Sequence, residues 1–212
     1  KPQFQRDSWM NLNGLWAFEI DNGRSGKARG LSAADAQLSG QILVPFCPQS
    51  ELSGVNHKDF LSGVWYRRTF ELTKEQLSGW VALHFGAVDY RCEAFVNGVS
   101  VGTHTGGYVS FCFDVTEAVR EGENVLTVYA EDDERDPLIP RGKQSELFYS
   151  HGCDYTRTTG IWQTVWLEFL PETHIEKIKI FPSVETGSFD VEALLKGAGT
   201  LTVEAAYEGR PM

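Results

Sequence analysis

A polar loop that leads into an apolar strand holds the side chains most able to do binding chemistry. Asp154 and Arg157 lie in this loop, and the chain then passes through Gly160 into residues 161–169. That segment is apolar on both faces, with Ile161, Val165, Leu167 and Phe169 on one side and Trp162 and Trp166 on the other. A strand that needs cover on both faces lies centrally in a two-layer β structure. Its loop end can hold ligand groups on a rigid support, whereas a plain core strand does not explain Asp154 and Arg157.

Alternating apolar residues predict an antiparallel β protein. Residues 64–72 and 81–85 each place large apolar side chains on one face, which is typical of a sheet with one solvent-facing side. Asn97-Gly98 between two apolar runs is a strong hairpin signal, because both turn residues must tolerate positive φ. Only residues 32–38 and 116–120 have helical patterns, each of one or two turns. Many short strands and one long connection, residues 131–153, predict a jelly-roll-like β-sandwich whose functional loops lie at one end.

Charge and hydropathy exclude several classes of partner. The formal net charge of −10 repels nucleic acid and anionic membrane surfaces, and no cluster of Lys and Arg offsets it locally. No apolar run approaches the roughly 18 residues that a membrane span needs. Residues 1–4 do not resemble the apolar core of a signal peptide, which favours a cytoplasmic location. A periplasmic or secreted protein whose signal was removed before Lys1 is the alternative.

The cysteines are even in number but far apart, at Cys47, Cys92, Cys112 and Cys153. A chain of 212 residues can hold a core without disulfides, so we expect free thiols. Cys92 and Cys112 lie in strand-like segments and are expected to be buried as small apolar side chains. There is no CxxC motif, and His151, Cys153 and Asp154 have no second cluster to complete a tetrahedral site. We therefore expect no metal and no cofactor.

Ordered blocks across residues 8–170 resemble the N-terminal sugar-binding domain of glycoside hydrolase family 2, the family of β-galactosidases, β-glucuronidases and β-mannosidases. In family order, these blocks are residues 11–18, 44–46, 65–70, 83–90, 96–98, 102–108, 111–116, 140–144 and 154–168. Any one block is weak evidence, because Asn-Gly between apolar runs is merely a hairpin. The ordered set is specific, and the resemblance implies the same all-β, jelly-roll-like sandwich that the alternation predicts.

The resemblance also implies a role for the loop before Gly160. In family members, a carboxylate on this loop reaches into the active site of a separate barrel and hydrogen-bonds a sugar hydroxyl. Alignment on Gly160-Ile161 places Asp154 at that position, with Arg157 as the second candidate for substrate contact. A charge-assisted hydrogen bond of this kind contributes roughly 1.5–3 kcal/mol. A solvated aspartate, or a salt bridge between Asp154 and Arg157, is the alternative.

Three further residues are expected to support this loop. Arg141 and Lys143 lie on the same connection, and we expect them to orient it by pairing with local carboxylates such as Glu146 or Asp136. Direct approach to the barrel is the alternative for both. Tyr108 is expected to pack beside the same end of the sandwich. The tryptophans at strand positions, Trp65, Trp162 and Trp166, are expected to belong to the core, with stacking on sugar rings as the alternative.

A predicted boundary divides the chain into residues 1–171, a sugar-binding jelly-roll domain, and residues 172–212. In the second part, residues 174–181, 189–195 and 201–207 have strand patterns separated by turn residues. The resemblance implies that these strands begin an immunoglobulin-like sandwich, which needs about seven strands and about 100 residues. We therefore expect a truncated second domain, whose unpaired strand edge favours self-association.

The same resemblance indicates whether this chain can catalyse glycoside hydrolysis by itself. A retaining glycosidase needs two carboxyl groups about 5 Å apart. In this family they lie on a (β/α)8 barrel, the acid/base within an Asn-Glu pair, and this chain has neither that dipeptide nor an alternating β/α pattern. We expect a non-catalytic fragment of a family 2 glycoside hydrolase, whose carbohydrate substrate is shared with the missing barrel. A free-standing, lectin-like carbohydrate-binding module is the alternative.

Overall fold

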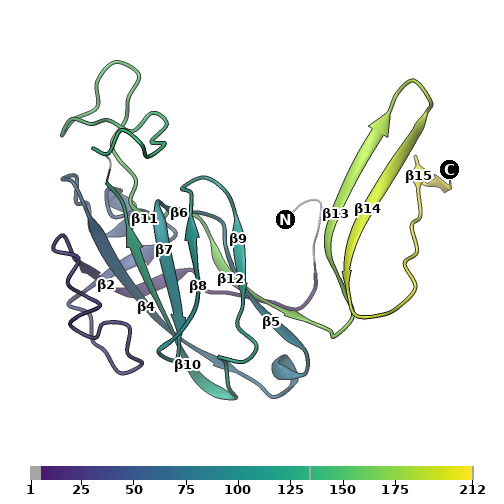
Figure 1. Cartoon of the computed structure of the whole chain (residues 1–212), viewed down its shortest axis with the longest axis horizontal. Helices are drawn as coiled ribbons and strands as arrows, with labels where there is room; N and C mark the ends of the chain where they lie inside the picture. The colour runs from purple at the N-terminus through teal and green to yellow at the C-terminus, as the bar shows by residue number, and fades with distance from the viewer. Residues whose placement is uncertain (1–5, 134, 212) are drawn as a thin grey trace. The chain divides into compact units, whose positions relative to one another are not determined.

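The computed structural model describes residues 6–133 and 135–211, and nearly all of the regular structure is β-strand (Figure 1). The chain divides into two compact units, Lys1–Phe169 and Leu170–Met212, close to the predicted boundary. Among the described residues, no helix is long and apolar enough to cross a membrane.

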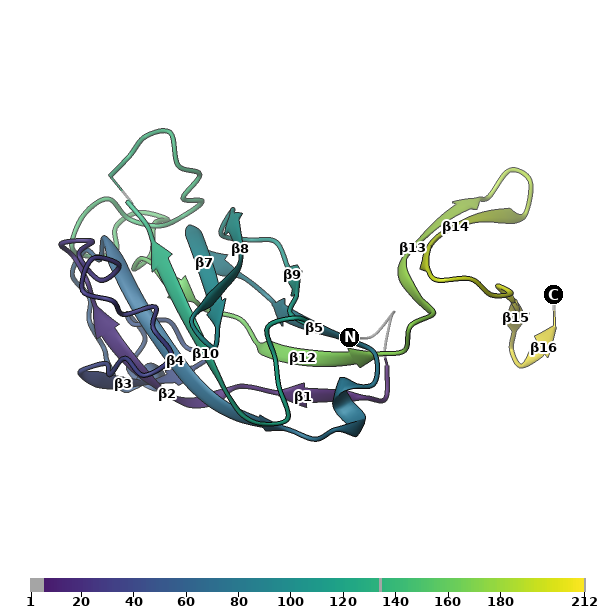
Figure 2. The same cartoon turned by 60° about the horizontal axis from the view of Figure 1, so that its bottom comes forward.

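Unit 1 contains two main sheets, and Figure 2 shows β1, β12 and β5 side by side, apart from β4 and β10. The first sheet has the order β3 (Gly40–Val44), β2 (Gly14–Ile20), β4 (Gly63–Leu72), β10 (Gly122–Glu131), β7 (Arg91–Val96) and β8 (Val99–Thr105). The second has the order β1 (Trp9–Asn11), β12 (Val165–Leu170), β5 (Trp80–Phe85) and β9 (Phe111–Asp114). The short strands β6 (Val88–Asp89) and β11 (Gly160–Ile161) pair with each other, and η1 (Glu51–Ser53) and η2 (Glu75–Leu77) are 3₁₀ turns.

One hydrophobic cluster fills the space between the two sheets. Alternate residues of β5 and β12 belong to it, as their spacing predicts, while Tyr66, Leu126 and Val128 come from the six-stranded sheet. β10 pairs antiparallel with both β4 and β7, so this strand is hydrogen-bonded along both of its edges. The result is an antiparallel β-sandwich, which confirms the predicted all-β fold.

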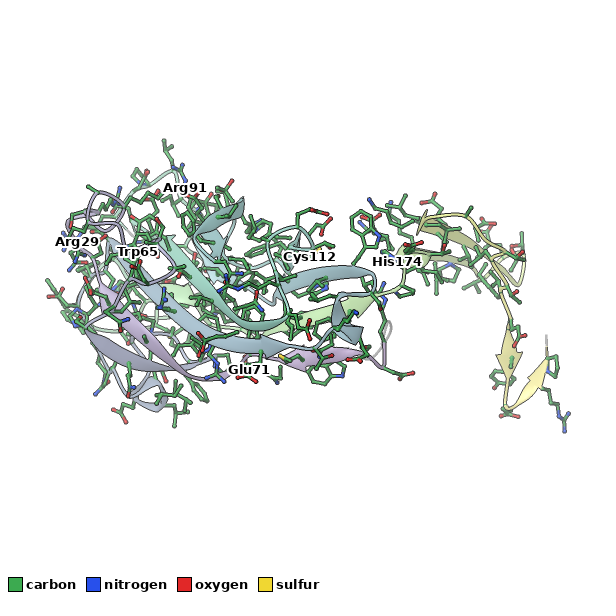
Figure 3. All side chains as sticks on the ribbon, turned by 90° about the horizontal axis from the view of Figure 1, so that it is seen from below. Arg29, Trp65, Glu71, Arg91, Cys112 and His174 are labelled. Carbon is green, nitrogen blue, oxygen red and sulfur yellow. The ribbon has the colours of Figure 1, made fainter. Side chains whose placement is uncertain are left out.

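A second, smaller cluster lies outside this core and is covered by residues 22–39. It contains Leu31, Trp65, Phe95 and Tyr129, and Trp65 stacks on Tyr129 with ring centres 4.7 Å apart. The buried carboxylate of Asp21 anchors the covering loop, because it accepts hydrogen bonds from the indole N–H of Trp65 at 3.0 Å and from the N–H of Gly26 at 2.7 Å. Trp65 is completely buried, as expected of a core tryptophan (Figure 3).

Three local predictions are wrong. Residues 32–38 and 116–120 form turns and bends rather than helical turns. The continuous strand predicted over 161–169 is divided by two contacts. The side-chain oxygen of Asn13 accepts a hydrogen bond from Val165 N–H, and the carbonyl of Thr164 accepts one from Gly86 N–H at 2.8 Å. These contacts end β11 at Ile161 and start β12 at Val165.

The cysteine prediction is correct in part. Cys47, Cys92 and Cys153 are free thiols. Cys92 is buried, and burial raises the pKa of its thiol to about 12. Cys112 is exposed, contrary to prediction, because it lies on the outward face of β9, opposite the inward-facing Phe111 and Phe113 (Figure 3).

The long connection between β10 and β11 has no regular strand in its described part. It is braced by two isolated bridges, a parallel one between Gln144 and Tyr155 and an antiparallel one between His151 and Asp154. Figure 1 shows this connection beyond the ends of β7 and β11, at one end of the sandwich. The placement agrees with a loop region that positions ligand-binding residues on a rigid support.

Unit 2 consists of two hairpins. β13 (His174–Ser183) pairs with β14 (Ser188–Lys196), and β15 (Ala206–Tyr207) pairs with β16 (Arg210–Pro211). The strands predicted at 174–181 and 189–195 are confirmed, but the strand predicted over 201–207 is wrong except for its last two residues. Glu208 and Gly209 have positive φ of 46° and 75° and turn the chain back at once, as a two-residue hairpin requires.

Candidate functional site

Asp154 lies at the end of a tight turn that its own main chain holds closed. Its N–H donates to the carbonyl of His151 at 2.8 Å, and the N–H of His151 donates to the carbonyl of Asp154 at 3.1 Å. Gly152 takes a φ of +53° inside the turn, where glycine is least strained. The side chain of Asp154 is 28% exposed, so the turn presents a carboxylate from a fixed backbone position.

Asp154 belongs to a small network of charged side chains. The imidazole Nε2 of His151 lies 3.7 Å from Asp154 Oδ2 and 4.0 Å from Glu146 Oε1, and its Nδ1 lies 3.0 Å from the hydroxyl of Ser145. Arg141 Nη1 lies 3.0 Å from Glu146 Oε2, which is the pairing expected for Arg141. The N–H of Glu146 itself, followed by the charges of Arg141 and His151, holds the pKa of this carboxyl below its ordinary value. Within this network, His151 is the side chain that faces Asp154 Oδ2.

Glu146, His151 and Asp154 each place one potential metal ligand atom within 4.8 Å of the others. One imidazole and two carboxylates suit a divalent cation by ligand type. Arg141, however, already pairs with Glu146, and a cation would have to compete with its guanidinium. The geometry is that of an ion-pair network around the Asp154 turn.

Arg157 is buried and its contacts are with the main chain. It is 1% exposed and donates to the carbonyls of Ser145, Leu147 and Lys58. Its guanidinium carbon also lies 4.2 Å from the centre of the Phe60 ring, a cation–π arrangement. Arg157 thus ties residues 58–60 to residues 145–147. The direct substrate contact predicted for it stays a prediction, and such a contact requires this brace to open.

The alternative of an internal salt bridge is not what the geometry shows. Asp154 and Arg157 are both described, and no ion pair joins them. Asp154 Oδ1 accepts no hydrogen bond from any residue that the structure describes, although Oδ2 faces His151. One oxygen of the carboxylate is therefore available to a ligand.

A buried polar network lies beside the Asp154 turn. The amide nitrogen of Gln144 donates to Asp89 Oδ2 at 2.8 Å and to the hydroxyl of Tyr108 at 3.1 Å, while its oxygen accepts from the N–H of Thr158 at 2.6 Å. Tyr108 in turn donates to the carbonyl of Arg141 at 2.8 Å, which joins Tyr108 to the connection that carries Asp154. Gln144 and Asp89 are site residues that the sequence reasoning did not single out. Each lay inside a recognised block, but nothing in the sequence indicated that they meet.

A cavity of about 200 Å³ opens next to this network. It is lined by Asp89, Tyr108, Lys143, Gln144, Tyr155, Thr156, Thr158 and Trp162. Two hydrogen bonds hold its walls together, from Tyr155 N–H to the carbonyl of Lys143 at 2.7 Å and from Ser145 N–H to the carbonyl of Tyr155 at 2.8 Å. The ammonium group of Lys143 forms no ion pair with a described residue, so the carboxylate pairing expected for it is absent there.

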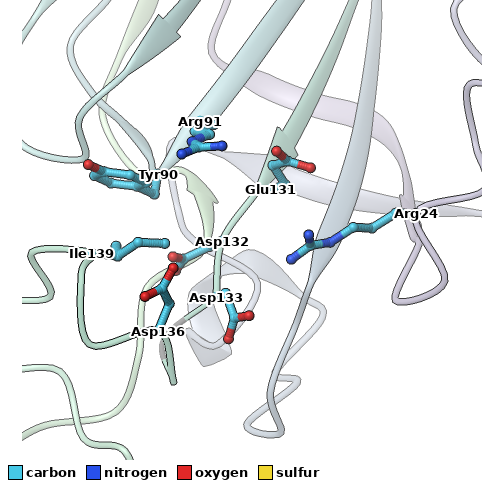
Figure 4. A pocket seen from close by; sticks show the side chains of 8 residues that line it. All are labelled: Arg24, Tyr90, Arg91, Glu131, Asp132, Asp133, Asp136 and Ile139. Carbon is cyan, nitrogen blue, oxygen red and sulfur yellow. The ribbon is translucent and has the colours of Figure 1, made fainter.

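A second hollow, of about 100 Å³, lies near the start of the same connection (Figure 4). Charges of both signs line it, from Arg24, Arg91, Glu131, Asp132, Asp133 and Asp136. Figure 4 shows the carboxylates of Asp132 and Asp136 beside Ile139, with Arg24 extending toward Asp133. Its volume is half that of the cavity beside Gln144.

Comparison with known proteins identifies the architecture. Residues 9–171 match the family described as "Glycosyl hydrolases family 2, sugar binding domain". A β-galactosidase of Thermoanaerobacter pseudethanolicus is 34% identical over 123 residues, which cover 57% of this chain and 16% of that protein. A β-galactosidase of Bacteroides ovatus is 29% identical over 202 residues, which cover 92% of this chain and 22% of that protein.

A solved structure shows the same fold. The crystal structure of Ruminococcus gnavus β-glucuronidase superposes with a TM-score of 0.73 at 21% identity, covering 92% of this chain and 34% of that one. At this identity the likeness concerns the fold. The present chain spans about a third of that structure, and a smaller share of each of the two β-galactosidases.

Proposed function

Because the chain belongs to glycoside hydrolase family 2, we propose that it is the sugar-binding part of a glycosidase and has no glycosidase activity by itself. The match over residues 9–171 and the names of the relatives, β-galactosidase and β-glucuronidase, support this proposal. The reaction proposed for the whole protein is hydrolysis of a β-linked O-glycosyl bond. A retaining mechanism needs two carboxyl groups about 5 Å apart, and we assign these to a catalytic barrel outside this chain.

The main support for a substrate-binding site is the position of the Asp154 carboxylate. It projects from a turn that two main-chain hydrogen bonds close, its Oδ2 faces His151, and its Oδ1 is left available. A sugar presents neighbouring hydroxyl groups, each of which can donate to a carboxylate oxygen. We propose that Asp154 accepts such a hydrogen bond from the substrate held by the barrel.

The surrounding residues have supporting roles in this proposal. Arg157 and Tyr108 hold the loop through main-chain carbonyls, and Arg141 holds Glu146. They position Asp154 without contacting the sugar. This matters because a binding group must be held to within about 0.5 Å to be effective.

The test is Asp154→Ala in the full-length protein that contains this chain. We expect kcat/KM for a β-galactoside or β-glucuronide to fall by about 2 kcal/mol, roughly 30-fold, with little change in melting temperature. Glu121→Ala is the matched control, because Glu121 is an exposed carboxylate just before β10, at the opposite end of the strand that leads into the site.

Unchanged kinetics on both classes of glycoside would refute the assignment. A large fall in melting temperature would instead assign Asp154 to the fold. The isolated chain should not hydrolyse aryl β-glycosides. Millimolar or tighter binding of a monosaccharide by the chain alone would favour the lectin-like alternative.

A further inference from the structure

The cavity beside the Asp154 turn is built by segments that are far apart in the sequence. Tyr155 and Thr156, which directly follow Asp154, form one wall. The other walls come from β6, the turn that carries Tyr108, residues 143–144 and the residue after β11, Trp162. The cavity therefore borders the segment that carries Asp154, beginning one residue further along the chain.

The floor of the cavity is rigid. Asp89 and Gln144 are 1% and 8% exposed, and the Gln144 amide is bonded at both its oxygen and its nitrogen. Gly107 passes directly against the Asp89 carboxylate, and a Cβ at this position would collide with it. A satisfied buried network of this kind keeps one shape, so the cavity is present before any ligand arrives.

The walls offer the two kinds of surface that a sugar ring requires. Tyr108 and Trp162 meet edge to face with ring centres 6.1 Å apart, and the indole N–H of Trp162 is held by the carbonyl of Gly107 at 2.8 Å. The side chain of Tyr155 is 62% exposed. Aromatic surfaces pack on the apolar C–H face of a pyranose, while hydroxyl and ammonium groups bond its rim.

Lys143 brings a positive charge to the cavity wall and has no ion-pair partner among the described residues. It is exposed and forms no ion pair within the described chain, whereas Arg141, two residues earlier, is paired with Glu146. An ammonium group has three N–H donors and can bond several sugar hydroxyls at once.

We propose that this cavity is a second sugar subsite, which holds the pyranose unit adjacent to the one that Asp154 contacts. The inference rests on the proposed function of Asp154. Lys143 donates to hydroxyl groups of this second unit, and Tyr155 packs on its apolar face. The chain then contributes to the choice between oligosaccharides and simpler glycosides, in addition to holding the first sugar.

The experiment compares a substrate that has a second ring with one that lacks it. In the full-length protein, kcat/KM is measured for lactose and for β-galactosyl fluoride, or for the matching glucuronosyl pair if the protein hydrolyses glucuronides. Lys143→Met and Tyr155→Leu should each lower the value for the disaccharide about tenfold and change the value for the fluoride less than about twofold. Lys74→Met, at the opposite end of the sandwich, should change neither.

The result separates this inference from the proposed function. Asp154→Ala should lower kcat/KM for both substrates, whereas the cavity variants should lower it for the disaccharide and leave the value for the fluoride nearly unchanged. An unchanged ratio in both Lys143→Met and Tyr155→Leu overturns the subsite, whatever Asp154→Ala does. Equal losses on both substrates overturn it as well, because they place these residues at the first sugar or in the fold.

A direct measurement uses the chain itself. The side-chain N–H groups of Gln144 and Trp162 lie in the cavity walls and report on its occupancy by ¹⁵N NMR. Titration with the disaccharide should shift both signals, and the shifts should be lost in Lys143→Met. Shifts confined to other residues contradict the proposal.

Discussion

Two loop regions of the sandwich differ in where they place their apolar side chains. Residues 22–39 bury Leu31 and part of Leu38 against Trp65, which is completely buried. The connection between β10 and β11 instead leaves Phe148, Tyr149 and Tyr155 between 60% and 66% exposed. The first loop closes a small core of its own, and the second does not.

The two loops are also held in different ways. The first depends on one buried carboxylate, Asp21, that receives an indole and main-chain N–H groups. The second depends on its own main-chain bridges and on Arg157 and Gln144, whose side chains bond the backbone. A loop that is stiffened through its backbone leaves its other side chains free to contact a ligand. The first loop is called the structural loop below, and the second, for its proposed role, the binding loop.

The largest expected effect is on stability in the structural loop. Trp65→Ala removes a buried ring that stacks on Tyr129 and bonds Asp21, and it should lower the free energy of unfolding of the sandwich by about 3–5 kcal/mol. Tyr149→Ala, in the binding loop, should cost less than about 1 kcal/mol because the ring is mostly exposed. Urea denaturation of both variants measures the difference, and equal losses would remove the distinction between the loops.

The next effect concerns the brace of the binding loop. Arg157→Met leaves the carbonyls of Ser145, Leu147 and Lys58 without their donor and should cost about 3 kcal/mol. Hydrogen exchange should become faster in residues 57–60 and 145–149 and stay unchanged in residues 22–39. Arg135→Met is the control, because Arg135 also lies over the Phe60 ring, at 3.9 Å, but is exposed. A similar response to both substitutions would show that only the contact with Phe60 matters.

The smallest effect is a pH dependence of the structural loop. Burial by itself would raise the pKa of Asp21, but hydrogen bonds from Trp65, Gly26 and Ser25 bring it below its ordinary value of 3.8. A carboxyl whose pKa is lowered by folding contributes stability that is complete above the unfolded pKa and is lost as the pH falls through the folded pKa.

Asp21→Asn should therefore cost about 1–3 kcal/mol at pH 7, and the difference from the parent chain should shrink as the pH falls below about 4. Acid titration of the unfolding free energy provides the measurement. A difference that stays constant down to pH 2 would mean that the charge of Asp21 does not contribute.

Much of the fold could be predicted because its signals are local. The alternation in β5 and β12 separates core from solvent, and Asn97-Gly98 forms the predicted hairpin turn, with φ of 52° and 83° between β7 and β8. Predictions failed where a distant contact overrides local preference. Asn13, 152 positions before Val165, accepts the Val165 N–H and interrupts the predicted strand 161–169. In unit 2, residues 201–205 have the alternation of a strand, but only Ala206 and Tyr207 pair with another described strand.

The sequence by itself determined the sandwich, and its resemblance to the family singled out Asp154 in the loop before Gly160. Both follow from periodicity and from ordered motifs, which act along a few neighbouring residues. Only the tertiary structure decided that Arg157 is directed to main-chain carbonyls and that Gln144 joins Asp89, 55 positions away, in the floor of a cavity. A buried polar side chain takes whichever partners the packed chain brings within hydrogen-bonding distance, and that choice is made by contacts across the whole fold.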